Sequence, residues 1–174
     1  MPNYFYRALR RNEEANAMRQ PDHDRLASLC HQDLRREVLL AIATGNKTPS
    51  PFLHVTTDLN VARRIMQERA SLYNGMVVRF PTSAISAQHT ICICSDKARK
   101  QFLNQNDGDS EEVISHLYMA RKFTQKDKEV LLLKRPSQEL IEVVDVYTGL
   151  PVSEDKEPDF TGLRVLQDSA TRRQ

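Results

Sequence analysis

Three short apolar runs in this chain each carry polar residues on the side that large apolar residues also occupy. The polar residues are Arg7 in NYFYRAL, His54 and Thr56 in PFLHVTT, and Glu129 in KDKEVLLLK. Successive side chains of a β-strand point to opposite faces, so each of these groups shares a face with its apolar second neighbours. Burying a polar or charged group is costly unless it is paired or used. The runs therefore predict strands whose polar groups together bind an anionic substrate and act on it.

The size and composition of the chain are those of a single globular domain. It has 174 residues, of which 40% are hydrophobic and 28% charged. From residue 150 onward the sequence is polar and shows little core pattern. We therefore expect one folded domain over 1–149 and a polar, partly disordered tail over 150–174.

Charge and cysteine content limit the class of protein further. The net charge of +2 is too weak to indicate nucleic-acid binding without a clustered patch, and Arg7, Arg10 and Arg11 form the nearest one. No apolar stretch approaches the roughly 20 residues that span a bilayer, and the N-terminus lacks the apolar region of a secretory signal. With only three cysteines, we expect reduced thiols and an intracellular, cytoplasmic protein without a membrane partner.

The spacing of apolar residues predicts a mixture of strands and helices. Alternation predicts strands at 4–9, 52–56, 76–80, 90–94, 129–133 and 140–147. Helical spacing predicts helices at 22–44, 59–71 and about 110–121. Asn74-Gly75 is typical of a turn, and residues 101–110 are typical of a polar loop. These elements do not alternate as βαβ units, which favours an α+β domain.

The chain lacks the motifs of common nucleotide and metal sites. With only five glycines, it contains neither GxGxxG nor GxxxxGK[ST], which argues against Rossmann and P-loop folds. His89, Cys92 and Cys94 form H-x-x-C-x-C, but a structural zinc site needs four ligands and no fourth is apparent nearby. The cysteines alternate with isoleucines as in a strand, so we expect small core residues and no metal there.

Taken in order, the three polar runs resemble the Arg–Ser–Glu signature of the ADP-ribosyltransferase superfamily, which includes bacterial mono-ADP-ribosylating toxins. FYRAL resembles the first-strand motif, and PFLHVTTDLNVAR resembles F-[IL]-S-T-S-x-x-x-x-x-A, with Phe52 and Ala62 at matching positions. KDKEVLLL resembles the acidic-x-Glu-hydrophobic motif, and RPSQELIEVVDV resembles the turn and strand that follow it. Two positions depart from the signature: His54 stands where the leading serine is expected, and Asp127 replaces a glutamate or glutamine.

The resemblance implies split antiparallel β-sheets flanked by helices, with NAD bound in the cleft between them. Such an enzyme cleaves the nicotinamide–ribose bond of NAD and transfers ADP-ribose to a protein or nucleic-acid acceptor. The transition state resembles an oxocarbenium ion, which a carboxylate stabilises electrostatically. By this resemblance Glu129 is catalytic, and Arg7, His54 and Thr56 bind NAD. Asp127, expected two positions earlier on the same side of the strand, would position or deprotonate the acceptor.

The resemblance also assigns roles around these five residues. Tyr73 or Phe123 would stack on nicotinamide, and residues 121–128 correspond to the acceptor-recognition loop of the family. The basic content of that segment hints at an acidic or nucleic acceptor. Aspartate at position 127 does not identify which acceptor atom is modified.

Other interpretations of the same residues stay open. Arg7 also fits a structural arginine that bridges a carboxylate, His54 a core histidine, and Glu129 an ordinary charge at the start of a strand. Without the leading serine, the domain also fits a catalytically inactive nucleotide- or partner-binding module. Two further alternatives are a nucleic-acid-binding protein and an RNA 2′-phosphotransferase on the same fold.

Overall fold

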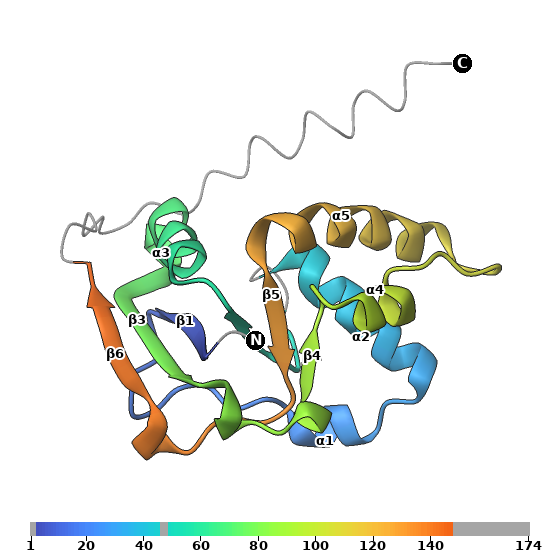
Figure 1. The fold of residues 1–174 in the computed structure, drawn as a ribbon. Coiled ribbons are helices and arrows are strands. Elements are labelled where there is room, and N and C mark those ends of the chain that lie inside the picture. The colour runs from blue at the N-terminus through green and yellow to red at the C-terminus, as the bar shows by residue number, and fades with distance from the viewer. Residues whose placement is uncertain (1–2, 46–48, 148–174) are drawn as a thin grey trace.

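A single six-stranded antiparallel sheet organises the protein, and helices cover it to give an α+β fold (Figure 1). The computed structural model describes residues 3–45 and 49–147. The strand order is β4-β5-β2-β1-β3-β6. The strands are β1 Tyr4–Arg10, β2 Leu53–Thr56, β3 Tyr73–Pro81, β4 Thr90–Cys92, β5 Glu129–Leu132 and β6 Glu142–Val146. The strands expected from alternation all form, with shifts at their ends, which confirms this part of the prediction.

The sheet consists of two halves that are joined weakly in the middle. The strands β1 and β2 pair only through Tyr6 and Thr56. Within each half the pairing is longer: β2 and β5 pair over their whole length, and β1 follows β3 from Tyr4 to Arg10. The halves β4-β5-β2 and β1-β3-β6 therefore meet at one residue pair.

Apolar side chains are divided between the two faces of this sheet. One face carries a continuous core cluster that spans both halves and includes Leu9, Leu53, Phe80 and Leu132. On the other face, the half with β5 packs under α2 (His31–Thr44), α4 (Asp96–Phe102) and α5 (Glu111–Asp127). The half with β1 and β3 packs under α3 (Leu59–Glu68). The second face therefore holds two separate cores, one on each side of the weak joint.

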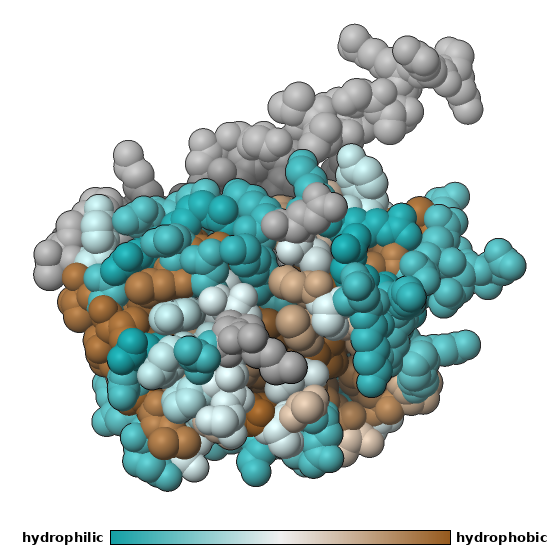
Figure 2. Space-filling view, viewed as in Figure 1, coloured by the Kyte–Doolittle hydropathy of each residue, from teal (hydrophilic) through white to brown (hydrophobic). Residues whose placement is uncertain are grey.

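The surface of the molecule reflects this packing. Polar side chains dominate the helical side, and an apolar strip follows the edge where β6 lies (Figure 2). Val143 and Val146 of β6 are exposed. The remaining elements are short, namely α1 (His23–Ala27) and the 3₁₀ turns Ala70–Leu72, Thr82–Ala84, Ala87–His89 and Gln138–Leu140.

The helix expected over 22–44 is two helices, because the helical conformation is interrupted between Ala27 and His31. Asp22 caps α1 by accepting a bond from the Arg25 amide, and the Ser28 hydroxyl donates to the Arg25 carbonyl. Cys30 then adopts an extended conformation before α2 begins. Serine and aspartate satisfy helix ends locally, so they interrupt a pattern that apolar spacing alone would continue. Gly45 ends α2 as expected, with φ of 55°.

Two further expectations about local structure are wrong, and one helix was missed. The predicted turn at Asn74-Gly75 lies inside β3, where Gly75 has φ of 88° and the Asn74 carboxamide bonds the Met76 amide. Helix α4, capped by Ser95, was not expected at all. The segment 121–128, expected as a loop, mostly continues α5 to Asp127, because Leu117, Ala120 and Thr124 form a buried helical stripe. The tail predicted over 150–174 lies outside the described residues.

Candidate functional site

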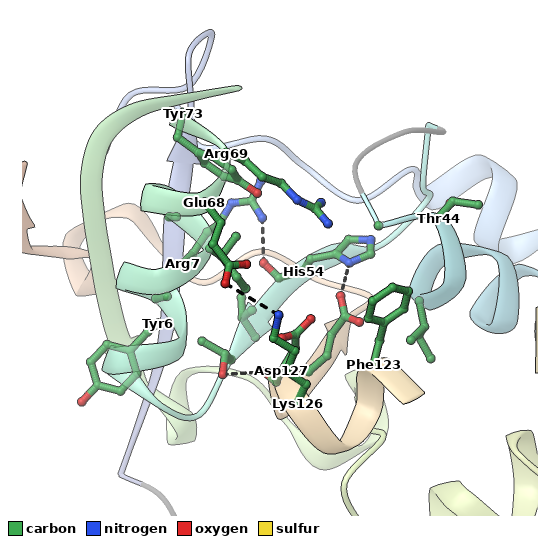
Figure 3. Close-up of a pocket in the computed structure, with 18 of the residues that line it drawn as sticks. Tyr6, Arg7, Thr44, His54, Glu68, Arg69, Tyr73, Phe123, Lys126 and Asp127 are labelled. Carbon is green, nitrogen blue, oxygen red and sulfur yellow. Dashed lines mark hydrogen bonds and ion pairs between the residues drawn. The ribbon is translucent and has the colours of Figure 1, made fainter. Parts of the chain in front are cut away.

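A pocket of about 190 Å³ opens on the second face of the sheet, where the two halves meet. It lies between α3 and the C-terminal end of α5 (Figure 3). Its lining includes all five residues that the sequence singled out, namely Arg7, His54, Thr56, Asp127 and Glu129. The two aromatic candidates, Tyr73 and Phe123, line it as well. Residues far apart in the sequence therefore share one cavity.

The carboxylate of Glu129 is held by a histidine. Nδ1 of His54 contacts Oε1 of Glu129, and Nε2 of the same ring lies 2.8 Å from the Ser50 hydroxyl. Both ring nitrogens are therefore engaged, which fixes the orientation of the imidazole. His54 and Glu129 are both largely buried, with side chains 13% and 16% exposed. The residue that replaces the expected serine thus contacts the carboxylate directly.

Arg7 reaches the pocket from the opposite face of β1. It shares that face with Phe5 and Leu9, as alternation predicted, and both pack in the cluster on that face. Where the ladder between β1 and β2 lapses, Nη1 of Arg7 donates to the His54 carbonyl at 2.7 Å. The guanidinium is only 6% exposed, and its Nε has no hydrogen-bond partner among the described residues. One buried donor of Arg7 is therefore unsatisfied beside the cavity.

Glu13 neutralises Arg7 and was missed by the sequence analysis. Its carboxylate accepts two bonds from Nη2 of Arg7, at 2.8 and 2.9 Å, and further bonds from the backbone amides of Arg10 and Arg19. Burial alone would raise the pKa of Glu13, but the charge of Arg7 and these hydrogen bonds lower it instead. The interpretation of Arg7 as an arginine that bridges a carboxylate is therefore correct, and Arg7 lines the pocket at the same time.

Thr56 ties the end of β2 to the end of α5. Its hydroxyl donates to the Asp127 carbonyl at 3.0 Å and accepts a bond from the Asp58 amide. Asp58 in turn caps α3 and pairs with Lys128 at 2.8 Å. Thr56 thus fixes the segment that leads into Glu129, with which it is paired across the sheet.

Asp127 does not lie on the strand of Glu129, contrary to the sequence-based expectation. It is the last residue of α5, and Lys128 in the left-handed conformation, with φ of 45°, separates it from β5. Its side chain pairs with Arg64 of α3. Burial raises the pKa of Asp127 despite this partner, and the nearby charge of Glu129 acts in the same direction. Asp127 nevertheless lines the same pocket as Glu129.

Further charged side chains surround the pocket between α3 and α5. Glu68 and Lys126 approach to 3.6 Å and link the two helices, and Arg69 lies beside Glu68 (Figure 3). Arg10 also lines the cavity, and burial together with the charge of Arg7 lowers its pKa. Arg10 belongs to the basic patch noted in the sequence and Lys126 to the segment 121–128, whereas no pattern marked Glu68 or Arg69. The pocket thus combines the Glu129 carboxylate, held by His54, with the cations Arg10, Arg69 and Lys126. The cations suit a ligand with negatively charged groups, and the carboxylate suits positive charge that forms on it during a reaction.

Outside the pocket, the histidine and the two cysteines of the H-x-x-C-x-C segment bond to different groups. Nδ1 of His89 lies 2.8 Å from the Ser86 hydroxyl. A hydrogen bond from Cys94 lowers the pKa of the Cys92 thiol to about 6. In the described part of the chain, no group of three His, Cys, Asp or Glu side chains is arranged to hold a metal ion.

Comparisons with protein-family models, with curated proteins and with solved structures give no match to this chain. Over residues 3–45 and 49–147, none of the helices has the length and apolar character needed to cross a bilayer.

Proposed function

We propose that the protein is an NAD-dependent mono-ADP-ribosyltransferase that cleaves the nicotinamide–ribose bond and transfers ADP-ribose to a macromolecular acceptor. The observation that carries this proposal is the convergence of Arg7, His54, Thr56 and Glu129 in one cavity, with His54 holding the Glu129 carboxylate. The division of the sheet into halves that meet at one residue pair also supports it, because the family resemblance implies NAD bound between two sheets. Three free cysteines suit the intracellular setting in which we place this reaction.

The cavity suits part of NAD and not the whole dinucleotide. At about 190 Å³ it is smaller than the roughly 300–1,000 Å³ that is usual for sites of drug-sized ligands. We assign it to the nicotinamide and its ribose, with Tyr73 or Phe123 offering an aromatic face. Arg7 lines the cavity, and its guanidinium is the type of donor that binds ribose or diphosphate oxygens. Arg69 and Lys126, which also line the cavity, offer positive charge to the diphosphate of NAD.

In the proposed reaction, the bond between ribose C1′ and nicotinamide nitrogen breaks and nicotinamide leaves with the electron pair. Glu129, held in place by His54, stabilises the positive charge that develops on the ribose. The acceptor then forms a bond to C1′ and releases a proton. Asp127 lines the pocket, and its raised pKa makes it a better base for this proton than an ordinary aspartate.

The test is nicotinamide release from NAD by the intact chain and by Glu129→Gln. Removing one preorganised electrostatic group costs on the order of 10²–10³ in turnover, so we expect a loss of that size with the fold unchanged by circular dichroism. The matched control is Glu139→Gln, which removes the same charge from an exposed residue that does not line the pocket. Equal NAD consumption by the wild-type protein and the Glu129 variant would refute the proposal.

A nucleotide-binding module without transferase activity is the second candidate. It is favoured by one observation: the two key charged groups already have protein partners, since Glu13 neutralises Arg7 and His54 engages Glu129. Such a module is stabilised by NAD, because a ligand that binds only the folded state raises its melting temperature. A thermal shift with NAD, together with no release of nicotinamide, would support this candidate over the enzyme.

A further inference from the structure

A second hollow, of about 640 Å³, lies between α4 and the C-terminal half of α5. It shares no lining residue with the first pocket, although Lys128 in its lining directly precedes Glu129 in the chain. Four of the residues that line it are cations, namely Arg99, Lys100, Arg121 and Lys128. The only carboxylate in the lining is that of Asp96. The hollow therefore carries a clear excess of positive charge beside the proposed catalytic site.

Two of these cations have no side-chain partner among the described residues. The side chains of Arg99 and Lys100 are exposed on α4 and make no hydrogen bond or ion pair with any described residue. The others are fixed in place: Arg121 donates to the Leu103 carbonyl at 2.7 and 2.9 Å, and Lys128 pairs with Asp58. Fixed and free positive charges together form a surface that favours a polyanion.

An exposed aromatic side chain lies on α5, one helical turn before Arg121 of the hollow. Tyr118 of α5 is 70% exposed, the largest exposure among the exposed large hydrophobic residues that the structure describes. It lies one helical turn before Arg121 and Lys122, so the ring and these two cations share one side of the helix. Aromatic rings between positive charges are what single-stranded nucleic acids bind, because bases stack on the ring while phosphates contact the cations.

We propose that this surface binds single-stranded nucleic acid, with phosphates in the hollow between α4 and α5 and a base on Tyr118. The guanidinium of Arg99 can bind phosphate or carboxylate oxygens through its planar fork. The exposed ring of Tyr118 favours a nucleic acid over an acidic protein surface, since a base has a flat face to stack and a carboxylate has none. Binding of the nucleic acid does not depend on the proposed function. Only its role as acceptor of ADP-ribose rests on that function.

The test is fluorescence anisotropy of a labelled 20-nucleotide oligouridylate with the full chain at several NaCl concentrations. Four phosphate contacts on a single strand give a slope of about −3 for the logarithm of the binding constant against the logarithm of salt concentration. The double variant Arg99→Ala/Lys100→Ala removes two contacts, so the slope falls to about −1.4 and the affinity at 0.1 M salt drops by roughly 25-fold. The control Arg36→Ala/Lys134→Ala loses the same charge outside the hollow and retains binding.

A second variant tests the aromatic contact separately from charge. Tyr118→Ala lowers affinity by about 5–150-fold while leaving the salt slope unchanged, and Tyr118→Phe retains affinity because the ring remains. Equal binding by the Arg99/Lys100 variant and its control would overturn the inference, as would equally effective displacement by polyglutamate of similar charge. Binding is measured without NAD and also with Glu129→Gln, which we expect to bind normally. If the protein binds the oligonucleotide but releases no nicotinamide from NAD, only the proposed function is refuted. If it releases nicotinamide but does not bind the oligonucleotide, only this inference is refuted.

Discussion

The ion pair between Glu13 and Arg7 is the contact on which the geometry of the pocket most depends. Both side chains are buried, at 4% and 6% exposure, and the carboxylate accepts bonds from one side chain and two backbone amides. Glu13→Gln keeps the shape but leaves the Arg7 charge buried without a counter-charge. Removing one partner of a buried pair costs about 3–5 kcal/mol, so we expect that loss in the free energy of unfolding. For a domain of this size it corresponds to a melting temperature lower by about 6–20 °C.

The assay is urea denaturation at pH 7 followed by circular dichroism, with Glu14→Gln as the matched control. Glu14 is the adjacent residue and is exposed, so its substitution removes the same charge without affecting a buried pair. We also expect the double variant Arg7→Met/Glu13→Gln to lose less stability than the sum of the two single changes, because the uncompensated charge is gone. Equal denaturation midpoints for Glu13→Gln and Glu14→Gln would refute this account of the pair.

The same pair predicts a pH dependence with a definite sign. The pKa of Glu13 is lower in the folded protein than its ordinary value of 4.5, so its ionised form contributes stability above pH 4.5. That contribution is lost as pH falls through 4.5 toward the lower pKa of the folded state. The difference in stability between the wild-type protein and Glu13→Gln should therefore shrink below about pH 4.5. A difference that stays constant down to acid denaturation would contradict the lowered pKa.

Two further predictions concern the ends of β4 and α5. A hydrogen bond from Cys94 lowers the pKa of Cys92 to about 6, so alkylation of Cys92 by iodoacetamide should increase with pH around a midpoint near 6. Cys94→Ala should move that midpoint upward. Mass spectrometry of the labelled peptide measures both midpoints, and an unchanged midpoint in the variant would contradict the hydrogen bond. Lys128→Gly should stabilise the protein by about 0.5–1 kcal/mol in urea denaturation, since glycine adopts the left-handed conformation without the cost that a side chain incurs. Lys122→Gly, inside α5, should instead destabilise it by about 1 kcal/mol, and the same sign for both changes would refute the argument.

Alternation in the strands predicted the central part of the site because the two-residue period of a strand is visible in the sequence. It placed Arg7 with Phe5 and Leu9, and the structure brings Arg7, His54 and Glu129 to one pocket. The partner Glu13 lies in a polar segment without any period, so its position depends entirely on how that segment folds back. A single acidic residue of this kind has no signal that distinguishes it from its exposed neighbours.

Boundaries between elements caused most of the errors. Asp127 was expected on the strand of Glu129 because the polar residues before β5 give no apolar pattern that identifies a helix end. The helix ends at Lys128, which adopts a left-handed conformation. Glycine or asparagine usually occupies such a position, so the lysine gave no sign of a helix end. Helix α4 escaped notice because only Ala98 and Phe102 are buried in it, too few residues to show a helical period.

The single residue pair between β1 and β2 makes the middle of the sheet its most deformable line. Arg7 and the His54 carbonyl bridge that line through a side chain, whereas the strands on either side are held by backbone ladders. A small rotation of one half against the other would change the separation of Arg7 and Glu129 while each half kept its own hydrogen bonds. The apolar cluster that both halves share on the other face opposes such a rotation, so it sets the width of the site together with Arg7. A bound molecule that contacts both halves would add a further connection between them.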